Sequence, residues 1–446
     1  MKDLTKGSPL RLIITFALPI LLGSLFQQAY NFTDTIIIGQ ELGKSSIAAV
    51  GASASVVSLM FSTVNGLVTG FSVIIAKNFG AGDHAEMRRA IARTITFAGS
   101  ITVLIVVGIT VFITPLLQAL NTPAENLPEA RDYLFVVALG LIVTLIYNLE
   151  SGILRAVGDS VIPLIILIIS AVLNIVLDLL FVCAFQWGVT GAAAATVLAQ
   201  LISAIVCFIY LVKRRSFLLI KRGDFRFNAH EAGEMLSAGL GMALMYSIVD
   251  FGSIVQQNGI NDMGEDTIAA HTAARKILSL LLMPFSAVGA TMVTYCGQNR
   301  GAGKYRRIKT GIRDGLILSF GWCTLAIILI YLAGMFLVQL ILPDVEAYIT
   351  DTALDYLRFN VLFFYPLAVL LGVRSSLQGL GRGFIPLITS GIELGWKIVT
   401  VLVMIPWLGY FGVILSEPII WTICGIVIGI IAIFTLRSMP KEDMEE

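Results

Sequence analysis

Residues 154–165, LRAVGDSVIPLI, recur in the second half of the chain as residues 377–388, LQGLGRGFIPLI. In both copies a glycine-containing break interrupts a long apolar run, and a proline follows shortly after the next run begins. The chain therefore carries one helix–break–helix element twice, which indicates a duplicated fold.

Further pairs of segments repeat at the same spacing. They are 78–82 (NFGAG) with 299–303 (NRGAG), each followed by a basic stretch, 132–134 (DYL) with 355–357 (DYL), and 42–49 with 263–270. The offset is always 221–223 residues, which is half of the 446-residue chain. Parallel repeats of this kind, related by an axis along the membrane normal, frame substrate pathways in transporters. Duplication in a membrane enzyme or a structural protein is the alternative.

The composition is that of a membrane protein. The chain is 57% hydrophobic and 13% charged, with a mean hydropathy of +0.89. Apolar segments long enough to cross about 30 Å of hydrocarbon as helices recur along its whole length. The expected spans are 12–40, 46–77, 90–117, 131–156, 161–186, 189–212, 234–260, 267–297, 311–342, 350–378, 384–408 and 411–436.

We therefore predict an all-α polytopic membrane protein with twelve transmembrane helices in two pseudo-symmetric six-helix lobes around a central cavity. The predicted lobes are residues 1–212 and 234–446, and the polar stretch 213–233 is the predicted cytoplasmic linker. The five cysteines all fall inside apolar runs and fit neither a metal site nor a disulfide framework. There is no basic domain that would indicate a nucleic-acid partner.

Basic residues predict the orientation. If both termini and every second loop are cytoplasmic, the cytoplasmic segments hold 24 of the 30 Lys and Arg residues, and the outer loops hold only Lys44 and Arg131. Excess Lys and Arg in short loops mark the cytoplasmic side. We expect a multi-pass protein of the cell membrane with both termini in the cytoplasm, surrounded by the lipid bilayer and monomeric.

Asp34 lies inside the first apolar run. A charged side chain at the centre of a bilayer helix costs roughly 2.5–3.5 kcal/mol on the insertion scale, so an ion, proton or substrate site is the first hypothesis. A carboxylate near the helix end that is paired or reaches water is the alternative. Asn174 and Asp178, four residues apart, share one helix face, and Thr196 follows a very short turn at roughly the same depth. Two carboxylates, an amide and a hydroxyl suit a hard cation such as Na⁺, and a close carboxylate pair can equally hold a proton.

The second half does not repeat this set. Under the offset, Asn174 corresponds to Lys397, Asp178 to Val401, Thr196 to Glu417, and Asp34 to Gln256 or Val255. An ion site would then belong to the first lobe alone. Glu393 and Lys397 have the i, i+4 order that favours an intrahelical ion pair, whereas Asp250 and Lys276 can form a pair or face the cavity. The candidate cavity or substrate residues are Gln27, Tyr30, Asn31, Asp250, Gln256 and Lys276.

Taken together, these motifs resemble the multidrug and toxic compound extrusion (MATE) family of secondary transporters over nearly the whole chain. The resemblance rests on Leu18-Pro19, on Asp34-Thr35, on the two Gly-Ala-Gly loops with Gly297-Gln298-Asn299 before the second, on Tyr356-Leu357-Arg358, and on Arg155-Ala156 with Gly158-Asp159 and Pro163.

The chain looks like the DinF-like and archaeal branch. That resemblance implies a first-lobe H⁺ or Na⁺ site at Asp34, Asn174, Asp178 and Thr196, and a bend of the first helix at Pro19. The NorM-like branch instead relies on acidic residues of the seventh and tenth helices. Asp250 lies near the former position, but the interior of the tenth helix has no acidic residue.

The expected function is secondary antiport: export of an amphipathic organic cation, a xenobiotic of the multidrug type, in exchange for H⁺ or Na⁺ by alternating access. No ATP-binding motif is present and no cofactor is expected. The alternative is a lipid or lipid-linked sugar flippase, although the interior basic residues are few and outnumbered by carboxylates. A membrane enzyme is the third hypothesis. It would need a cluster of catalytic side chains, but His84, His230 and His271 lie far apart in the sequence.

Overall fold

The computed structural model describes residues 2–120, 122–226, 228–343 and 345–440, and within these ranges every regular element is helical. The chain forms two compact units, one of residues 1–3 and 22–243 and the other of residues 4–21 and 244–446. Two long helices, α1 (Pro9–Glu41) and α7 (Ala229–Asn261), contribute residues to both units. The first unit extends through the polar stretch 213–233 into the first turns of α7. These compact units are defined by contacts and not by membrane topology, so the predicted lobes 1–212 and 234–446 stay a prediction.

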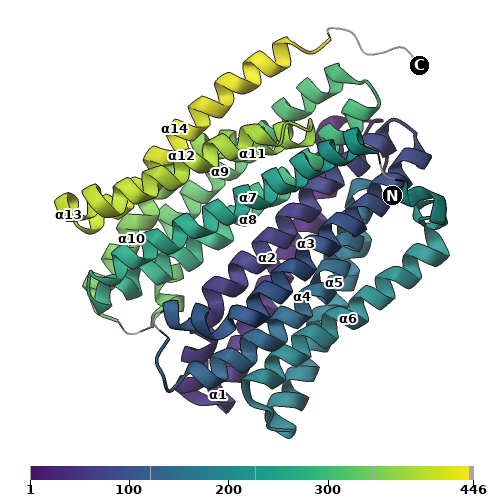
Figure 1. Cartoon of the computed structure of the whole chain (residues 1–446). Helices are drawn as coiled ribbons and strands as arrows, with labels where there is room; N and C mark the ends of the chain where they lie inside the picture. Colours follow the sequence, from purple (N-terminus) through teal and green to yellow (C-terminus); the bar gives the residue numbers. More distant parts are fainter. Residues whose placement is uncertain (1, 121, 227, 344, 441–446) are drawn as a thin grey trace. The chain divides into compact units, whose positions relative to one another are not determined.

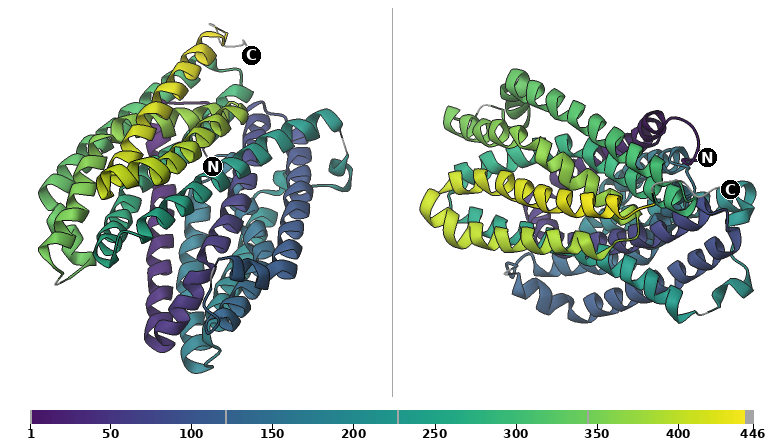
Figure 2. Two further views of the ribbon diagram at one scale, coloured as in Figure 1. Left: turned by 60° about the vertical axis from the view of Figure 1, so that its left-hand side comes forward. Right: turned by 90° about the horizontal axis from the view of Figure 1, so that it is seen from above.

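The first unit is a bundle of long helices running side by side (Figures 1 and 2). Helix α4 packs against α2, α3 and α6, and α5 packs against α6. Leu67 and Phe71 of α2 and Leu134 and Leu141 of α4 are fully buried in its core. The bounds are α2 Gly43–Gly80, α3 His84–Ala119, α4 Leu127–Ala156, α5 Val161–Asp178, η1 Leu179–Ala184, α6 Gly188–Arg214, η2 Ser216–Leu218 and η3 Arg222–Phe225.

The second unit repeats this arrangement. Helix α8 packs against α9, α10 and α11, while α14 packs against α11 and α12. Tyr295, Tyr356, Phe16 and Phe364 are the largest side chains fully buried in its core. The bounds are α8 Glu265–Gly301, α9 Tyr305–Ile341, α10 Ala347–Leu362, α11 Phe364–Gly379, α12 Phe384–Val399, η4 Thr400–Met404, α13 Ile405–Leu408 and α14 Tyr410–Arg437.

The prediction of twelve spans is confirmed. Within the described ranges, eleven helices are long and apolar enough to cross a membrane, and α10 with α11 forms a twelfth, bent by 57°. The bend has a local cause in Pro366. Proline has no N–H to donate and its ring crowds the carbonyl four residues earlier, which here belongs to Leu362, the last residue of α10.

The repeated sequence motifs are helix stops of one kind. Gly158 after α4 and Gly381 after α11 both have positive φ, +86° and +72°, a conformation that glycine adopts without strain. The following amide closes each helix end by donating to the carbonyl five residues back, from Asp159 to Leu154 and from Arg382 to Leu377. This is the hydrogen bond of a glycine C-cap. The same bond follows Gly82 and Gly303, so the duplicated residues fix where equivalent helices end.

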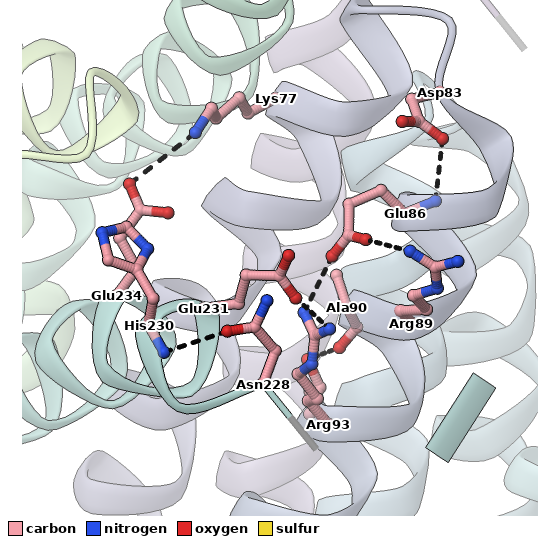
Figure 3. Close-up of polar contacts among 11 residues, drawn as sticks. Lys77, Asp83, Glu86, Arg89, Ala90, Arg93, Asn228, His230, Glu231 and Glu234 are labelled. Atoms are coloured by element: carbon pink, nitrogen blue, oxygen red, sulfur yellow. Dashed lines mark hydrogen bonds and ion pairs between the residues drawn. The ribbon is translucent and has the colours of Figure 1, made fainter. Parts of the chain in front are cut away.

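A cluster of charged side chains holds the start of α7 within the first unit (Figure 3). The buried guanidinium of Arg93 on α3 contacts Glu86 at 2.8 Å and also pairs with Glu231 on α7. Lys77 on α2 lies 3.7 Å from Glu234, one turn further along α7. Two ion pairs from neighbouring helices thus fix the first two turns of α7 to α2 and α3.

Candidate functional site

Asp34 projects from α1 into a polar cavity of the first unit. Its side chain is half-buried, and its Oδ1 atom is buried with no hydrogen-bond partner among the described residues. The neighbouring hydroxyls do not satisfy it: Thr33 donates to the carbonyl of Ala29 at 3.0 Å and Thr35 donates to that of Asn31 at 2.9 Å. A carboxylate oxygen kept out of water without a donor is costly, which suits a site that receives a cation or proton.

Asn174, Asp178 and Thr196 come together beside it. The amide nitrogen of Asn174 on α5 donates to the hydroxyl of Thr196 on α6 at 3.3 Å. This bond turns the amide so that Oδ1 of Asn174 stays buried without a partner in the described chain, as do both carboxylate oxygens of Asp178. The structure therefore places these three predicted residues in one cluster, and its unsatisfied atoms are all oxygen acceptors.

Asp178 lies at a break in regular helix geometry. It is the last residue of α5, and the chain continues directly into the π-helical turn η1, Leu179–Ala184. Single π turns inside transmembrane helices are frequent at functional sites. The sequence reading expected an unbroken helix to residue 186, because apolar periodicity does not distinguish a π turn from an α turn. The side chain of Asp178 is fully buried and interacts electrostatically with Asp34.

The cavity has a volume of about 510 Å³, and its wall is mostly polar. Asp34, Asn174 and Thr196 line it, together with the predicted residues Gln27, Tyr30 and Asn31 of α1. Pockets of 300–1,000 Å³ hold drug-sized ligands, so the space exceeds what an ion needs. Tyr30 and Asp34, four residues apart on α1, line the same cavity.

Sequence reasoning missed the wall that α4 supplies. Thr144 donates to Gln200 on α6 at 2.5 Å, and Asn148 donates to Asn65 on α2 at 3.0 Å. The signal was present in the sequence, since polar and small residues follow each other on α4 at helical spacing. These cavity residues of α4 are Tyr133, Gly140, Thr144, Tyr147, Asn148 and Arg155.

The unpartnered atoms fit a hard monovalent cation or a proton. Asp34, Asn174 and Asp178 offer four buried acceptor oxygens without donors among the described residues, and Thr196 adds a hydroxyl oxygen. Oxygen ligands are what hard cations take. A proton on either carboxyl would instead convert an acceptor into a donor. The donor set fits either ion.

The candidate residues of the second unit are arranged differently. Gln256 is buried, Asp250 is half-buried and Lys276 is exposed, and Asp250 and Lys276 both have interaction partners. The predicted ion pair within one helix is wrong. Glu393 lies 3.4 Å from Arg374 on α11, and Lys397 lies 3.9 Å from Glu417 on α14. Side chains of neighbouring helices compete for both groups, which spacing along one helix does not register.

Comparison with known proteins identifies relatives along the full length of the chain. The MatE family model matches residues 19–180 and 239–403. The "Probable multidrug resistance protein YpnP" of Bacillus subtilis is 28% identical over 382 residues, covering 85% of this chain and 84% of the relative. The "FAD transporter" of Shewanella oneidensis is 25% identical over 439 residues, covering 93% and 92%.

The "Multidrug export protein MepA" of Staphylococcus aureus is 23% identical over 448 residues, covering 99% of this chain and 97% of the relative. Among solved structures, the crystal structure of MATE in complex with MaL6 superimposes with a TM-score of 0.90 at 23% identity and covers 99% of both chains. At that identity the likeness concerns the fold.

Proposed function

Because this chain belongs to the MatE family and is a membrane-spanning transporter rather than an enzyme, we propose that it exports small organic compounds by antiport with H⁺ or Na⁺. In an antiporter, the ion and the exported compound favour opposite conformations, since a ligand with equal affinity for two states shifts neither. The function therefore needs a site for the ion and a space for the compound.

The single observation that carries the proposal is the set of unsatisfied oxygens in the first unit. Asp34, Asn174 and Asp178 keep buried acceptors without partners among the described residues, in or beside a cavity large enough for an organic molecule. Polar and ionisable groups at membrane depth mark ion paths and proton relays. We assign the coupling ion to Asp34, Asn174, Asp178 and Thr196, and the compound to the remaining wall, including Gln27, Tyr30 and Asn31.

Pro19 supports a moving first helix. It lies inside α1, shortly before Leu22, where the helix passes from one compact unit to the other. A proline in a helix removes one backbone hydrogen bond and weakens the helix there. We propose that α1 bends at Pro19 when the ion binds at Asp34, which would change the cavity wall that Gln27, Tyr30 and Asn31 provide.

The experiment is efflux of a fluorescent organic cation from proteoliposomes, driven in separate runs by a pH gradient and by a sodium gradient. Asp34→Asn and Asp178→Asn should each abolish gradient-driven efflux. Asp262→Asn, at an exposed carboxylate in the second unit, should leave it unchanged. If both site variants still export the dye along either gradient, coupling through the first unit is refuted.

The same proteoliposomes test which compound the protein exports. Two relatives are named for multidrug resistance or export and one for FAD transport, so we propose an amphipathic organic cation and include FAD as a second substrate. A fluorescently labelled lipid serves as the third arm, because a lipid flippase would move it from one leaflet to the other. Gradient-driven lipid movement without dye export would overturn the proposed cargo.

Orientation and assembly are part of the proposal. The basic residues concentrate in segments that place both termini in the cytoplasm of a cell-membrane protein. We also propose a monomer, because each unit buries its own apolar core. Cysteine labelling from either side of intact cells and light scattering of the purified protein test these two points. Labelling of a terminal cysteine from outside would reverse the orientation.

A further inference from the structure

The two units place different chemistry at equivalent positions. Asn174 and Thr196 form a side-chain pair between α5 and α6 in the first unit. Their repeat equivalents, Lys397 and Glu417, form an ion pair between α12 and α14 in the second. Sequence offset alone assigned these equivalences. The contacts show that both positions meet across the same pair of helices in each unit.

The π turns lie close to these positions in both units. In the first unit η1 begins at Leu179, directly after Asp178, and in the second η4 begins at Thr400, three residues after Lys397. Since the repeat relates Asp178 to Val401, Thr400 corresponds to Leu177, so the two π turns overlap in the repeat and begin two residues apart. Lys397 thus projects from the helical turn that, in the first unit, carries Asn174 of the candidate ion site.

We propose that the ammonium group of Lys397 is a resident cation, occupying in the second unit the place that the coupling ion takes in the first. The inference rests on the ion site assigned under the proposed function. It goes further in identifying which residues make the second unit insensitive to external ions, and in predicting how that unit can be made sensitive.

The surroundings of Lys397 are those of a bound cation. Its side chain and that of Glu417 are each more than nine-tenths buried. The Lys397 Nζ atom donates to the hydroxyl of Ser253 on α7 at 3.1 Å and lies 3.9 Å from Oε1 of Glu417. A carboxylate and a hydroxyl oxygen are the kinds of acceptor that Asp178 and Thr196 offer in the first unit. An ammonium group supplies three donors and one positive charge, and needs no ion from solution.

Arg275 makes the site unattractive to a further cation. Its guanidinium lies 3.6 Å from the same Oε1 atom of Glu417, so two positive charges share one carboxylate. The other charged pair nearby, Arg374 with Glu393, is neutral overall. Two cations on one carboxylate disfavour the approach of a further cation to Glu417. Among the described residues, those that pair or interact electrostatically with Glu417 are Arg275 on α8, Tyr356 on α10, and Glu393 and Lys397 on α12. Arg374 on α11 pairs with Glu393, and His271 on α8 contacts Tyr356 and Tyr410.

The test begins with the Asp34→Asn variant of the full chain, which lacks the first-unit site. Arg275→Gln and Lys397→Met are then added, so that Glu417 is left without its two cations. Two readouts are used on purified protein: the shift in Tm when choline chloride is replaced by NaCl, and the proton uptake on stepwise acidification of a lightly buffered sample.

We expect Asp34→Asn to lose the cation response of the wild type and the triple variant to regain one. The regained response should disappear when Glu417→Gln is added. The control is the double variant Asp34→Asn with Lys397→Arg, in which Arg275 is intact. It retains a cation covalently attached at position 397 and should not regain the cation response. A triple variant that folds but shows neither a sodium-dependent shift nor additional proton uptake would overturn the inference.

A second measurement keeps the inference testable if the triple variant does not fold. Lys397→Met with Glu417→Gln, in an otherwise wild-type chain, removes one charge of each sign. Its cation response should equal that of the wild type, and a reduced response would show that the second unit binds the coupling ion after all. If Asp34→Asn instead keeps the full response, the first-unit site fails, while the Lys397 and Glu417 variants still decide the inference.

Discussion

Gly66 on α2 is a position where the structure leaves no room for a side chain at the α2–α7 contact. A Cβ atom there would lie 2.5 Å from the Cα atom of Ala243, 2.7 Å from its nitrogen and 2.8 Å from the carbonyl oxygen of Met242. All three are backbone atoms of α7, so no side-chain rotation can make space. Gly66→Ala therefore requires α2 and α7 to separate.

The cost follows from two opposing terms. Overpacking of a closely packed contact costs about 1–3 kcal/mol, and rigid backbone on the far side places this site at the upper end. Alanine is favoured over glycine in a helix by up to ~1 kcal/mol, which offsets part of that cost. We expect a net loss of about 1–2 kcal/mol, which lowers Tm by roughly 2–8 °C for a cooperative unit of this size.

The assay is thermal unfolding of purified protein at one fixed scan rate, because unfolding of large proteins is often irreversible and then depends on that rate. Gly51→Ala is the matched control: it lies on the same helix, and no atom comes within 4 Å of its added Cβ. The control should leave Tm unchanged or raise it slightly. If Gly66→Ala and Gly51→Ala have the same Tm, the close packing of α2 against α7 is wrong.

Three more predictions concern the ion pairs, the ion site and the hinge. Arg93→Gln should destabilise the protein by about 2–3 kcal/mol. This is less than the roughly 3–5 kcal/mol lost when a fully buried ion pair is broken, because the Glu231 side chain is one-third exposed. The charge swap Arg93→Glu with Glu231→Arg should recover part of the lost Tm, and no recovery would argue against this contact. Thr196→Val removes the hydroxyl that accepts the hydrogen bond of the Asn174 amide, and such a bond contributes about 0.5–1.5 kcal/mol. The ion concentration for half-maximal efflux should therefore rise by up to about tenfold. An unchanged concentration would show that Thr196 is not part of the site. Pro19→Ala should slow gradient-driven efflux while leaving dye binding unchanged in equilibrium titrations, and wild-type efflux rates would exclude the hinge.

The repeat allowed the fold to be predicted from the sequence because its signals are local. A glycine with positive φ, such as Gly158 or Gly381, ends a helix whatever the rest of the chain does. The length of an apolar run needed to span the membrane is likewise set by the thickness of the bilayer, so it can be read from each run separately. All twelve spans could therefore be located, including the one formed by α10 and α11. The 57° bend in that span was not predicted, although Pro366 was visible in the sequence.

The candidate site was predictable only in part. Charge at membrane depth identified Asp34, and the i, i+4 rule joined Asn174 to Asp178, but the π turn after Asp178 left no sequence signal. The contribution of α4 to the cavity was missed because uncharged polar residues such as Thr144 and Asn148 do not stand out in an apolar run as a buried charge does. Pairing between helices was the least predictable feature, since the contacts of Glu393 and Lys397 depend on which helices are neighbours.

The two halves of the chain separate what the fold requires from what function requires. Residues that end helices are duplicated, as Gly82 with Gly303 and Gly158 with Gly381. Residues at the candidate ion site are not duplicated. Asn174 and Thr196 of the first half correspond to Lys397 and Glu417 of the second, and each pair joins equivalent helices within its own unit. Had both units kept the oxygen set, two ions would bind and each unit would respond to the gradient. In the proposed antiport, the lysine in the second unit leaves the gradient to act on the first unit alone, so that ion binding changes one unit and not the other.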